Sequence, residues 1–303
     1  MSAGLRLASH LGYLSVDEPL FRDSVGSLDP VAHIEFAARL GFHGVLYPWV
    51  ATRPEEEVER VAAALEKHGM VAGCTAYAPF EVIPQPLWVQ SGSGARNELL
   101  GHVRRSVAAA RKVNSQILVV LLAGDAHSSR TQQRSAVIDN LHYVLDIATT
   151  AGLKVAVEPM IAFPDMLLQT TGEALELIAA VNHPEFGLVF DTGHVASMDD
   201  PENLARLFEE AYDHVMVLQL ADLPGRVEVG GGVLDVGAVL LHAMLENFTG
   251  LVELEHLWSQ PGVLGETAGL ERFRRIEAAA RQEAMLREPA MAKAMVRANG
   301  RTN

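Results

Sequence analysis

Short apolar runs rich in β-branched residues alternate along this sequence with longer segments of helical periodicity. The run at 117–122, ILVVLL, shows no alternation of apolar and polar residues, which is typical of a strand buried on both faces of a parallel sheet. Eight such runs occur, at residues 6–13, 44–50, 71–77, 117–122, 154–158, 187–190, 214–220 and 250–255. Their order predicts a series of β-α units.

Helical patterns fill the intervals between these runs. They occupy residues 30–40, 54–68, 96–113, 134–151, 171–181, 201–212 and 236–247, with a last helix at 269–285. Pro54 precedes three glutamates at 55–57, and the helix dipole favours acidic residues in a first turn. Gly41, Gly69 and Gly152 stand where helices are expected to end, a position that favours glycine.

Eight β-α repeats in 303 residues fit one closed α/β barrel. A doubly wound open sheet is the alternative, but it calls for a glycine-rich phosphate loop after the first strand, and HLGYLS at 10–15 is not one. We therefore predict an α/β fold, a single (β/α)8 TIM barrel of eight parallel strands with an extra C-terminal helix. One domain would span 1–303, with the barrel at about 5–276 and the helix end and a loose tail at 277–303.

Charge and composition narrow the possible partners. Asp and Glu outnumber Lys and Arg by 38 to 24, and the resulting net charge of −14 disfavours binding to nucleic acid. No apolar stretch approaches the ~20 residues that span a bilayer, and no secretory signal opens the chain. The single cysteine, Cys74, cannot form an internal disulfide. We expect a soluble cytoplasmic protein that binds no membrane.

Polar residues stand at the ends of four successive predicted strands, where packing does not require them. Glu158 closes the fifth, Asp191 the sixth and Gln219 the seventh, and Glu255 closes the eighth. In a TIM barrel these carboxyl ends form the active-site face. Glu253 and Glu255 are two residues apart and share one side of the last strand, but only Glu255 is near enough to its end to reach the mouth.

This oxygen-only set has a simple chemical interpretation. Mg²⁺ and Mn²⁺ prefer hard oxygen ligands, whereas zinc prefers histidine and cysteine. Three carboxylates gathered without a cation would force some of them to take up protons. The four strand ends therefore indicate one divalent metal ion, Mn²⁺ or Mg²⁺.

The segments around these residues resemble a known superfamily. VEP at 157–159, FDTGH at 190–194, QLADLPGR at 219–226 and ELEH at 253–256 are similar to motifs of the xylose-isomerase-like TIM-barrel superfamily of sugar isomerases and epimerases. Within it, QLADLPGRVEVGGGVLD most resembles a stretch of hydroxypyruvate isomerases. HLGYL, GFHGVLYP and LLAG also resemble that group, so the resemblance extends to about Ile276.

The resemblance implies roles for individual residues. The divalent metal would be held by Glu158, Asp191, Gln219 and Glu255. Glu158 and Glu255 would also be the catalytic acid/base pair that flanks the substrate. Substrate oxygens would be contacted by His194 and Arg226, with Glu228 near the same rim. The partner would be a small carbonyl compound or sugar, and a homo-oligomer is an open possibility.

The residue types suit a reaction that removes a proton next to a carbonyl. The cation would stabilise the enediolate through two vicinal oxygens, and a carboxylate would take the proton. An isomerase returns the proton to the neighbouring carbon, whereas an epimerase returns it to the other face of the same carbon. Arg226 could bind the carboxylate of hydroxypyruvate in bidentate fashion.

Three positions depart from hydroxypyruvate isomerases, and they alter the substrate rim rather than the metal set. Leu46 and Val233 stand where those enzymes carry glutamate, and Val229 stands where they carry proline.

A lyase or dehydratase, including a C-glycoside-cleaving subunit, would use the same site, and a non-catalytic sugar-binding barrel is a further alternative. A DNA-repair nuclease of the superfamily is disfavoured by the charge of −14.

Overall fold

The computed structural model describes residues 4–161, 163 and 165–299, whose strands form one parallel sheet. The strands are β1 (Arg6–His10), β2 (Gly44–Leu46), β3 (Val71–Ala72), β4 (Thr75–Ala76), β5 (Ile117–Val120), β6 (Lys154–Val157), β7 (Phe186–Asp191), β8 (Val215–Leu220) and β9 (Leu251–Leu254). Their order in the sheet is β3-β2-β1-β9-β8-β7-β6-β5-β4. All of their pairings are parallel.

The two end strands of this order, β3 and β4, are successive pieces of one predicted strand. β3 pairs with β2 and β4 pairs with β5, so together they close the sheet into a barrel with eight strand positions. The predicted (β/α)8 TIM barrel is confirmed. The break between the pieces has a physical cause, because the backbone N–H of Cys74 donates to the side chain of Glu253 at 3.0 Å instead of to a neighbouring strand.

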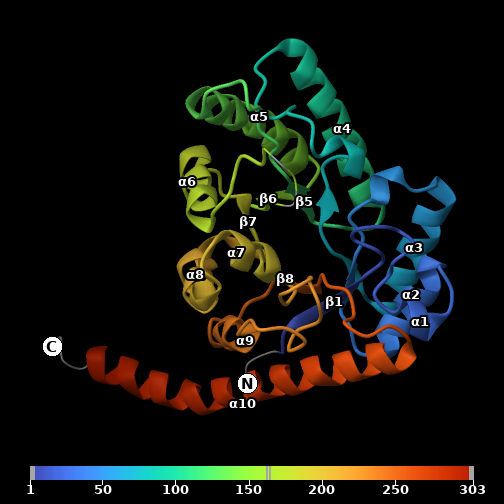
Figure 1. Cartoon of the computed structure of the whole chain (residues 1–303), viewed down its shortest axis with the longest axis vertical. Coiled ribbons are helices and arrows are strands. Elements are labelled where there is room, and N and C mark those ends of the chain that lie inside the picture. Colours follow the sequence, from blue (N-terminus) through green and yellow to red (C-terminus); the bar gives the residue numbers. More distant parts are fainter. Residues whose placement is uncertain (1–3, 162, 164, 300–303) are drawn as a thin grey trace.

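The helices surround the outside of the barrel (Figure 1). They are α1 (Arg22–Val25), α2 (Pro30–Arg39), α3 (Glu55–His68), α4 (Ser93–Lys112), α5 (Arg130–Thr150), α6 (Thr171–Val181), α7 (Thr192–Met198), α8 (Leu204–Ala211), α9 (Val236–Leu245) and α10 (Val263–Asn299). Short 3-10 turns lie at Val50–Thr52, Phe80–Val82, Pro201–Asn203 and Tyr212–His214. α5 begins four residues before the predicted start because Ser129 and Gln132 form a capping box.

The C-terminal helix is longer than the sequence indicated. α10 runs from Val263 to Asn299, past both ends of the predicted 269–285 and through most of the expected loose tail. Figure 1 shows it passing α9 and extending beyond the body of the barrel. Phe273, Ala280 and Ala284 are buried along it, so an apolar stripe holds this helix against the domain.

Both faces of the sheet are mostly apolar, as expected for parallel strands, but buried polar residues such as Gln219 and Glu253 lie among the apolar ones. Within the described part of the chain, no helix has the length and apolar character needed to cross a bilayer.

The strand register fixes which polar residues are neighbours. Asp191 on β7 pairs with Gln219 on β8, and Gln219 pairs with Glu253 on β9.

Candidate active site

Three of the predicted carboxylates meet at the carboxyl ends of β6, β7 and β9. Glu158, Asp191 and Glu255 are buried, and each offers an oxygen that lies within 4.8 Å of the others. Backbone pairing holds the two glutamates just beyond their strands, since the Glu158 N–H donates to Val120 O and the Glu255 N–H to Leu220 O, both at 3.1 Å. We call these three side chains the acidic cluster.

Asp191 has two structural tasks in this position. It is the last residue of β7 and also the N-cap of α7, where its Oδ1 accepts a hydrogen bond of 2.7 Å from the His194 backbone N–H. Aspartate is favoured at an N-cap because its carboxylate satisfies an otherwise unpaired N–H group of the first turn. The cap fixes the carboxylate and also brings the His194 side chain into the barrel mouth.

The Arg226 guanidinium binds two members of the acidic cluster. Its Nη1 and Nη2 lie 2.8 Å from the two Asp191 oxygens, and Nη2 lies 3.0 Å from Glu255 Oε1. Nη2 also donates to the Glu255 backbone oxygen at 3.1 Å. The Arg226 side chain is 18% exposed, whereas that of Asp191 is 0% exposed, so the pair is largely shielded from water.

The loop that carries Arg226 is built around Asp222, which is fully buried. Asp222 and Val227 exchange two backbone hydrogen bonds of 2.8 and 2.9 Å. The Asp222 carboxylate also accepts four backbone hydrogen bonds of 2.8–3.1 Å, from the N–H groups of Leu223, Gly230, Gly232 and Leu234. This ring of donors holds Arg226 in a left-handed conformation, with φ of 52°.

Burial and charge repulsion give the three carboxyl groups of the acidic cluster different pKa values. Burial and the nearby Asp191 raise the pKa of Glu158 to about 8. Burial and Glu158 likewise hold the pKa of Glu255 well above its usual range. Burial also opposes ionisation of Asp191, but Arg226 and His194 outweigh it and lower the pKa of that carboxyl. Burial lowers the pKa of His194 to about 4, so its ring is neutral at pH 7, with Nε2 3.8 Å from Glu158 Oε1.

Gln219 lies beside Asp191 in the sheet, and its amide nitrogen is turned to Glu253. Its Nε2 donates to Glu253 Oε2 at 2.9 Å. Its Oε1 is buried and has no hydrogen-bond partner within the described ranges. Buried polar oxygens are rarely left unpaired, so this atom is available to a further group.

The residues at this face fit a divalent cation. Among the described residues, Arg226 is the only Lys or Arg that forms an ion pair with the acidic cluster. Its single positive charge faces three carboxyl groups. Glu158 Oε1, like Gln219 Oε1, is buried without a hydrogen-bond partner in the described structure. All the candidate donors are oxygens, which Mg²⁺ and Mn²⁺ prefer.

Glu228, the remaining predicted site residue, is placed differently. It is 2% exposed, and its carboxylate accepts hydrogen bonds of 2.7 Å from Ser259 N, Ser259 Oγ and Arg272 Nη1. These contacts join the loop after β8 to the segment before α10 and to α10 itself. The structure therefore gives Glu228 a role in holding these segments together and does not bring it into the acidic cluster.

Tyr13 lies at the site although the strand-end pattern did not single it out. The Arg226 guanidinium carbon lies 5.5 Å from the centre of the Tyr13 ring, a cation–π distance. Burial raises the pKa of Tyr13 to about 12. The sequence did place Tyr13 at the end of the first predicted strand, at 6–13, and this position could have marked it as a site residue. In the structure the strand ends earlier, at His10.

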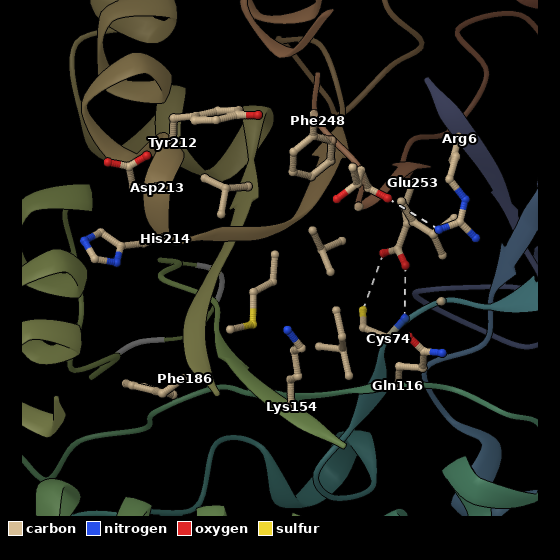
Figure 2. Close-up of a pocket in the computed structure, with 18 of the residues that line it drawn as sticks. Arg6, Cys74, Gln116, Lys154, Phe186, Tyr212, Asp213, His214, Phe248 and Glu253 are labelled. Atoms are coloured by element: carbon tan, nitrogen blue, oxygen red, sulfur yellow. Dashed lines mark hydrogen bonds between the residues drawn. The ribbon is translucent and has the colours of Figure 1, made fainter. Parts of the chain in front are cut away.

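A cavity of about 880 Å³ opens at the other end of the barrel (Figure 2). Arg6, Lys154 and Phe186, which begin β1, β6 and β7, line it. Its lining reaches inward to the buried residues Cys74 and Glu253. The cavity lining includes none of the acidic cluster, so the two sites occupy opposite ends of the barrel.

Comparison with known proteins identifies the architecture. A family model described as xylose isomerase-like TIM barrel matches residues 34–286. No curated protein sequence matches the chain.

Solved structures share the fold at low sequence identity. The apo form of 3-keto-D-glucoside 4-epimerase from E. coli is 18% identical, with a TM-score of 0.71 over 89% of this chain and 99% of that one. An AP endonuclease of family 2 from Brucella melitensis is 23% identical, with a TM-score of 0.71 over 89% and 98%. The IolI protein with a bound zinc atom is 17% identical, with a TM-score of 0.66 over 92% and 99%.

Proposed function

This chain belongs to the xylose isomerase-like TIM barrel family, and we propose that it is a divalent-metal-dependent isomerase or epimerase of small α-hydroxy carbonyl compounds. The observation that carries the proposal is the buried acidic cluster at the carboxyl ends of the strands, in which Glu158 Oε1 is unpaired, as is Oε1 of the nearby Gln219. TIM-barrel enzymes place their chemistry at this face. The epimerases among the structural neighbours support the same reaction class.

The metal would be held by oxygens of the acidic cluster and by Gln219 Oε1. When bound, Mn²⁺ or Mg²⁺ supplies Lewis acidity that polarises a substrate carbonyl. Zinc is bound in the IolI structure, but the donor set of this chain favours a harder cation. Metal content by elemental analysis would distinguish these ions.

Glu158 and Glu255 would carry the proton transfers. Removal of a proton beside a carbonyl needs an ionised base next to the substrate carbon, and a carboxylate held by a divalent cation would be ionised. In the metal-free protein, burial raises the pKa of Glu158 to about 8. Glu158 Oε1 is free of hydrogen bonds to the rest of the described protein, so it can hold or release a proton. Glu255 would return the proton to the neighbouring carbon in an isomerase, or to the opposite face in an epimerase.

His194 and Arg226 would position the substrate. The neutral His194 ring carries one N–H group, which can donate a hydrogen bond to a substrate oxygen. Arg226 is already paired with Asp191 and Glu255, so its first effect is to keep Asp191 ionised. Glu228 is occupied by Ser259 and Arg272, and it has no part in this proposal.

Solvent exchange tests the proposal directly. Protein loaded with Mn²⁺ would be incubated in D₂O with hydroxypyruvate, a ketohexose and an inosose. We expect deuterium to enter the carbon next to the carbonyl of at least one compound, and Glu158→Gln to abolish this exchange. The control is Glu266→Gln, because Glu266 is also buried but accepts its hydrogen bonds from the backbone N–H groups of Asp23 and Ser24.

The alternatives give different results in the same experiment. Bound Mn²⁺ without exchange into any compound would indicate a binding protein and would overturn the proposal. Loss of a leaving group from the substrate, seen as a change in product mass, would indicate a lyase or dehydratase instead.

A further inference from the structure

We propose that Glu253 is a positioning residue that fixes the side-chain amide of Gln219, with its oxygen toward the acidic cluster and its nitrogen away from it. The inference rests on the proposed function, since Gln219 Oε1 matters there as a candidate metal ligand. Glu253 itself is 0% exposed and lies inside the barrel, two residues before Glu255 along the chain. It belongs to no part of the mechanism described above.

Both oxygens of Glu253 are used as acceptors. Oε1 accepts from the Cys74 backbone N–H at 3.0 Å. Oε2 accepts from Gln219 Nε2 at 2.9 Å and from Cys74 Sγ at 3.4 Å. A primary amide offers hydrogens only from its nitrogen, so a carboxylate oxygen at this distance selects the orientation of the Gln219 amide. With its NH₂ group turned to Glu253, Gln219 is left with a free Oε1.

The reverse orientation would be costly. It would put Gln219 Oε1 against Glu253 Oε2, so that two acceptors would face each other in a buried space without a hydrogen between them. It would also put the NH₂ group in the place of the unpaired Oε1, and an amide nitrogen cannot ligate a cation there. Glu253 therefore chooses between a ligating and a non-ligating form of Gln219.

The backbone is shaped to receive the Glu253 carboxylate. A Cβ atom at Gly73 would lie 2.1 Å from Glu253 Oε1, so only glycine leaves room for it. The barrel strand breaks between β3 and β4 at this point, and the break frees the Cys74 N–H to bind Glu253. Figure 2 shows Cys74 and Glu253 joined across the inner part of the cavity at the N-terminal end of the barrel.

An exchange of two side chains tests the inference. In Glu253→Gln, the new side-chain oxygen would be retained by the Cys74 N–H, and the new NH₂ group would face Gln219. Gln219 would then turn over to accept from it and would present its own NH₂ group to the acidic cluster. Adding Gln219→Glu restores an oxygen on both sides, because Glu accepts from the new amide with one oxygen and faces the cluster with the other. The double variant keeps the net charge of the original protein.

The first measurement is Mn²⁺ affinity, from the electron paramagnetic resonance signal of free Mn²⁺. We expect Glu253→Gln to raise the dissociation constant by about 10–100-fold, the usual effect of losing a residue that orients a ligand. The double variant should recover most of that loss. Gln219→Glu alone is the reference, because a carboxylate at 219 would by itself tighten Mn²⁺ binding. A merely structural role for Glu253 predicts that Glu253→Gln weakens binding by the same factor whether residue 219 is Gln or Glu. Unchanged affinity in Glu253→Gln, or a double variant that binds no better than Glu253→Gln, would overturn the inference.

The second measurement uses metal-free protein and does not depend on the proposed function. The side-chain NH₂ resonances of Gln219 would be assigned by their absence in Gln219→Met. We expect them to exchange slowly with water in the original protein and to shift and exchange faster in Glu253→Gln. Unaltered resonances would refute the positioning role. If the original protein binds no Mn²⁺, the metal site is wrong, and this measurement alone decides whether Glu253 orients Gln219.

Discussion

Arg226 and Asp191 form a bidentate ion pair at the mouth of the barrel, with each Nη atom 2.8 Å from a different oxygen of the carboxylate. The Asp191 carboxylate is fully buried, and Arg226 Nη2 also contacts Glu255. Removing one partner of a buried pair leaves an uncompensated charge, which costs more than the pair itself contributes. The pair therefore makes the stability of the metal-free protein depend on Arg226.

Arg226→Met should lower the free energy of unfolding of the metal-free protein by about 3–5 kcal/mol, measured by urea denaturation. Mn²⁺ should restore much of the loss, because a cation held by the acidic cluster would compensate the same carboxylates. Arg134→Met is the control, since Arg134 pairs with Glu176 on the surface and such pairs contribute little. An equal decrease in the free energy of unfolding in the two variants would contradict a stabilising role for the Arg226–Asp191 pair.

The sequence predicts the barrel and the location of the candidate site because both follow from local patterns. Unbroken apolar runs indicate buried parallel strands, and polar residues that close such runs lie at one end of the barrel. Glu253 and Glu255 share one side of the last strand, and the position of Glu255 nearer the strand end favours it for the mouth. The structure brings Glu255 together with Glu158 and Asp191, and places Glu253 deeper, against Gln219.

Asp222→Asn should displace Arg226 from the acidic cluster, although Asp222 itself does not belong to the cluster. One of the two carboxylate oxygens of Asp222 would become an NH₂ group facing backbone N–H donors, so two of its four hydrogen bonds would be lost. The loop would loosen and Arg226 would leave the acidic cluster. Amide hydrogen exchange should show faster exchange at 223–234. Asp235→Asn, which alters only the cap of α9, serves as the control. Protection of 223–234 that is the same in both variants would count against Asp222.

Mn²⁺ affinity should rise with pH. Glu158 must lose its proton to bind a cation, and its pKa of about 8 means that the proton is mostly present at pH 6–7. Each unit of pH from 6 to 8 should therefore tighten binding by about tenfold from Glu158 alone, and Glu255, whose pKa is also held well above its usual range, should add to this dependence. Calorimetry in buffers of different ionisation enthalpy should show release of at least about one proton. Binding that does not change between pH 6 and 8 would contradict this acidity.

The stability of the metal-free protein should change in the opposite direction. The folded state holds a proton on Glu158 that the unfolded chain releases above its ordinary pKa of 4.5. The unfolded state is therefore favoured as pH rises from 4.5 to 8, and the contribution of this group to stability is lost over that window. Glu158→Gln cannot ionise, so its stability should fall less over the same range. Parallel urea-denaturation profiles for the two proteins would rule out the raised pKa.

Several features could not be predicted because they depend on residues far apart in the chain. Glu228 is held by Arg272, which is on α10 and 44 positions away, and nothing near Glu228 in the sequence indicates that contact. The break in the third strand depends on a side chain of β9, since Glu253 takes the Cys74 N–H. A strand pattern read locally predicts 71–77 as continuous, because the competing acceptor appears only when the barrel closes.

His10 should make the folded protein less stable as the pH falls below 6.5. It is 1% exposed, with Nδ1 accepting from the Gly12 N–H and Nε2 donating to the His256 backbone oxygen, and burial lowers its pKa to about 3. The unfolded chain takes up a proton on His10 below its ordinary pKa of 6.5, whereas the folded protein does so only near 3. Between these values stability should fall by up to about 1.4 kcal/mol for each unit of decreasing pH from this group alone. In His10→Gln that contribution is absent, so the stability advantage of the original protein should shrink steadily from pH 6.5 to 4 in urea denaturation. An advantage that stays constant over this range would show that His10 is protonated in the folded state.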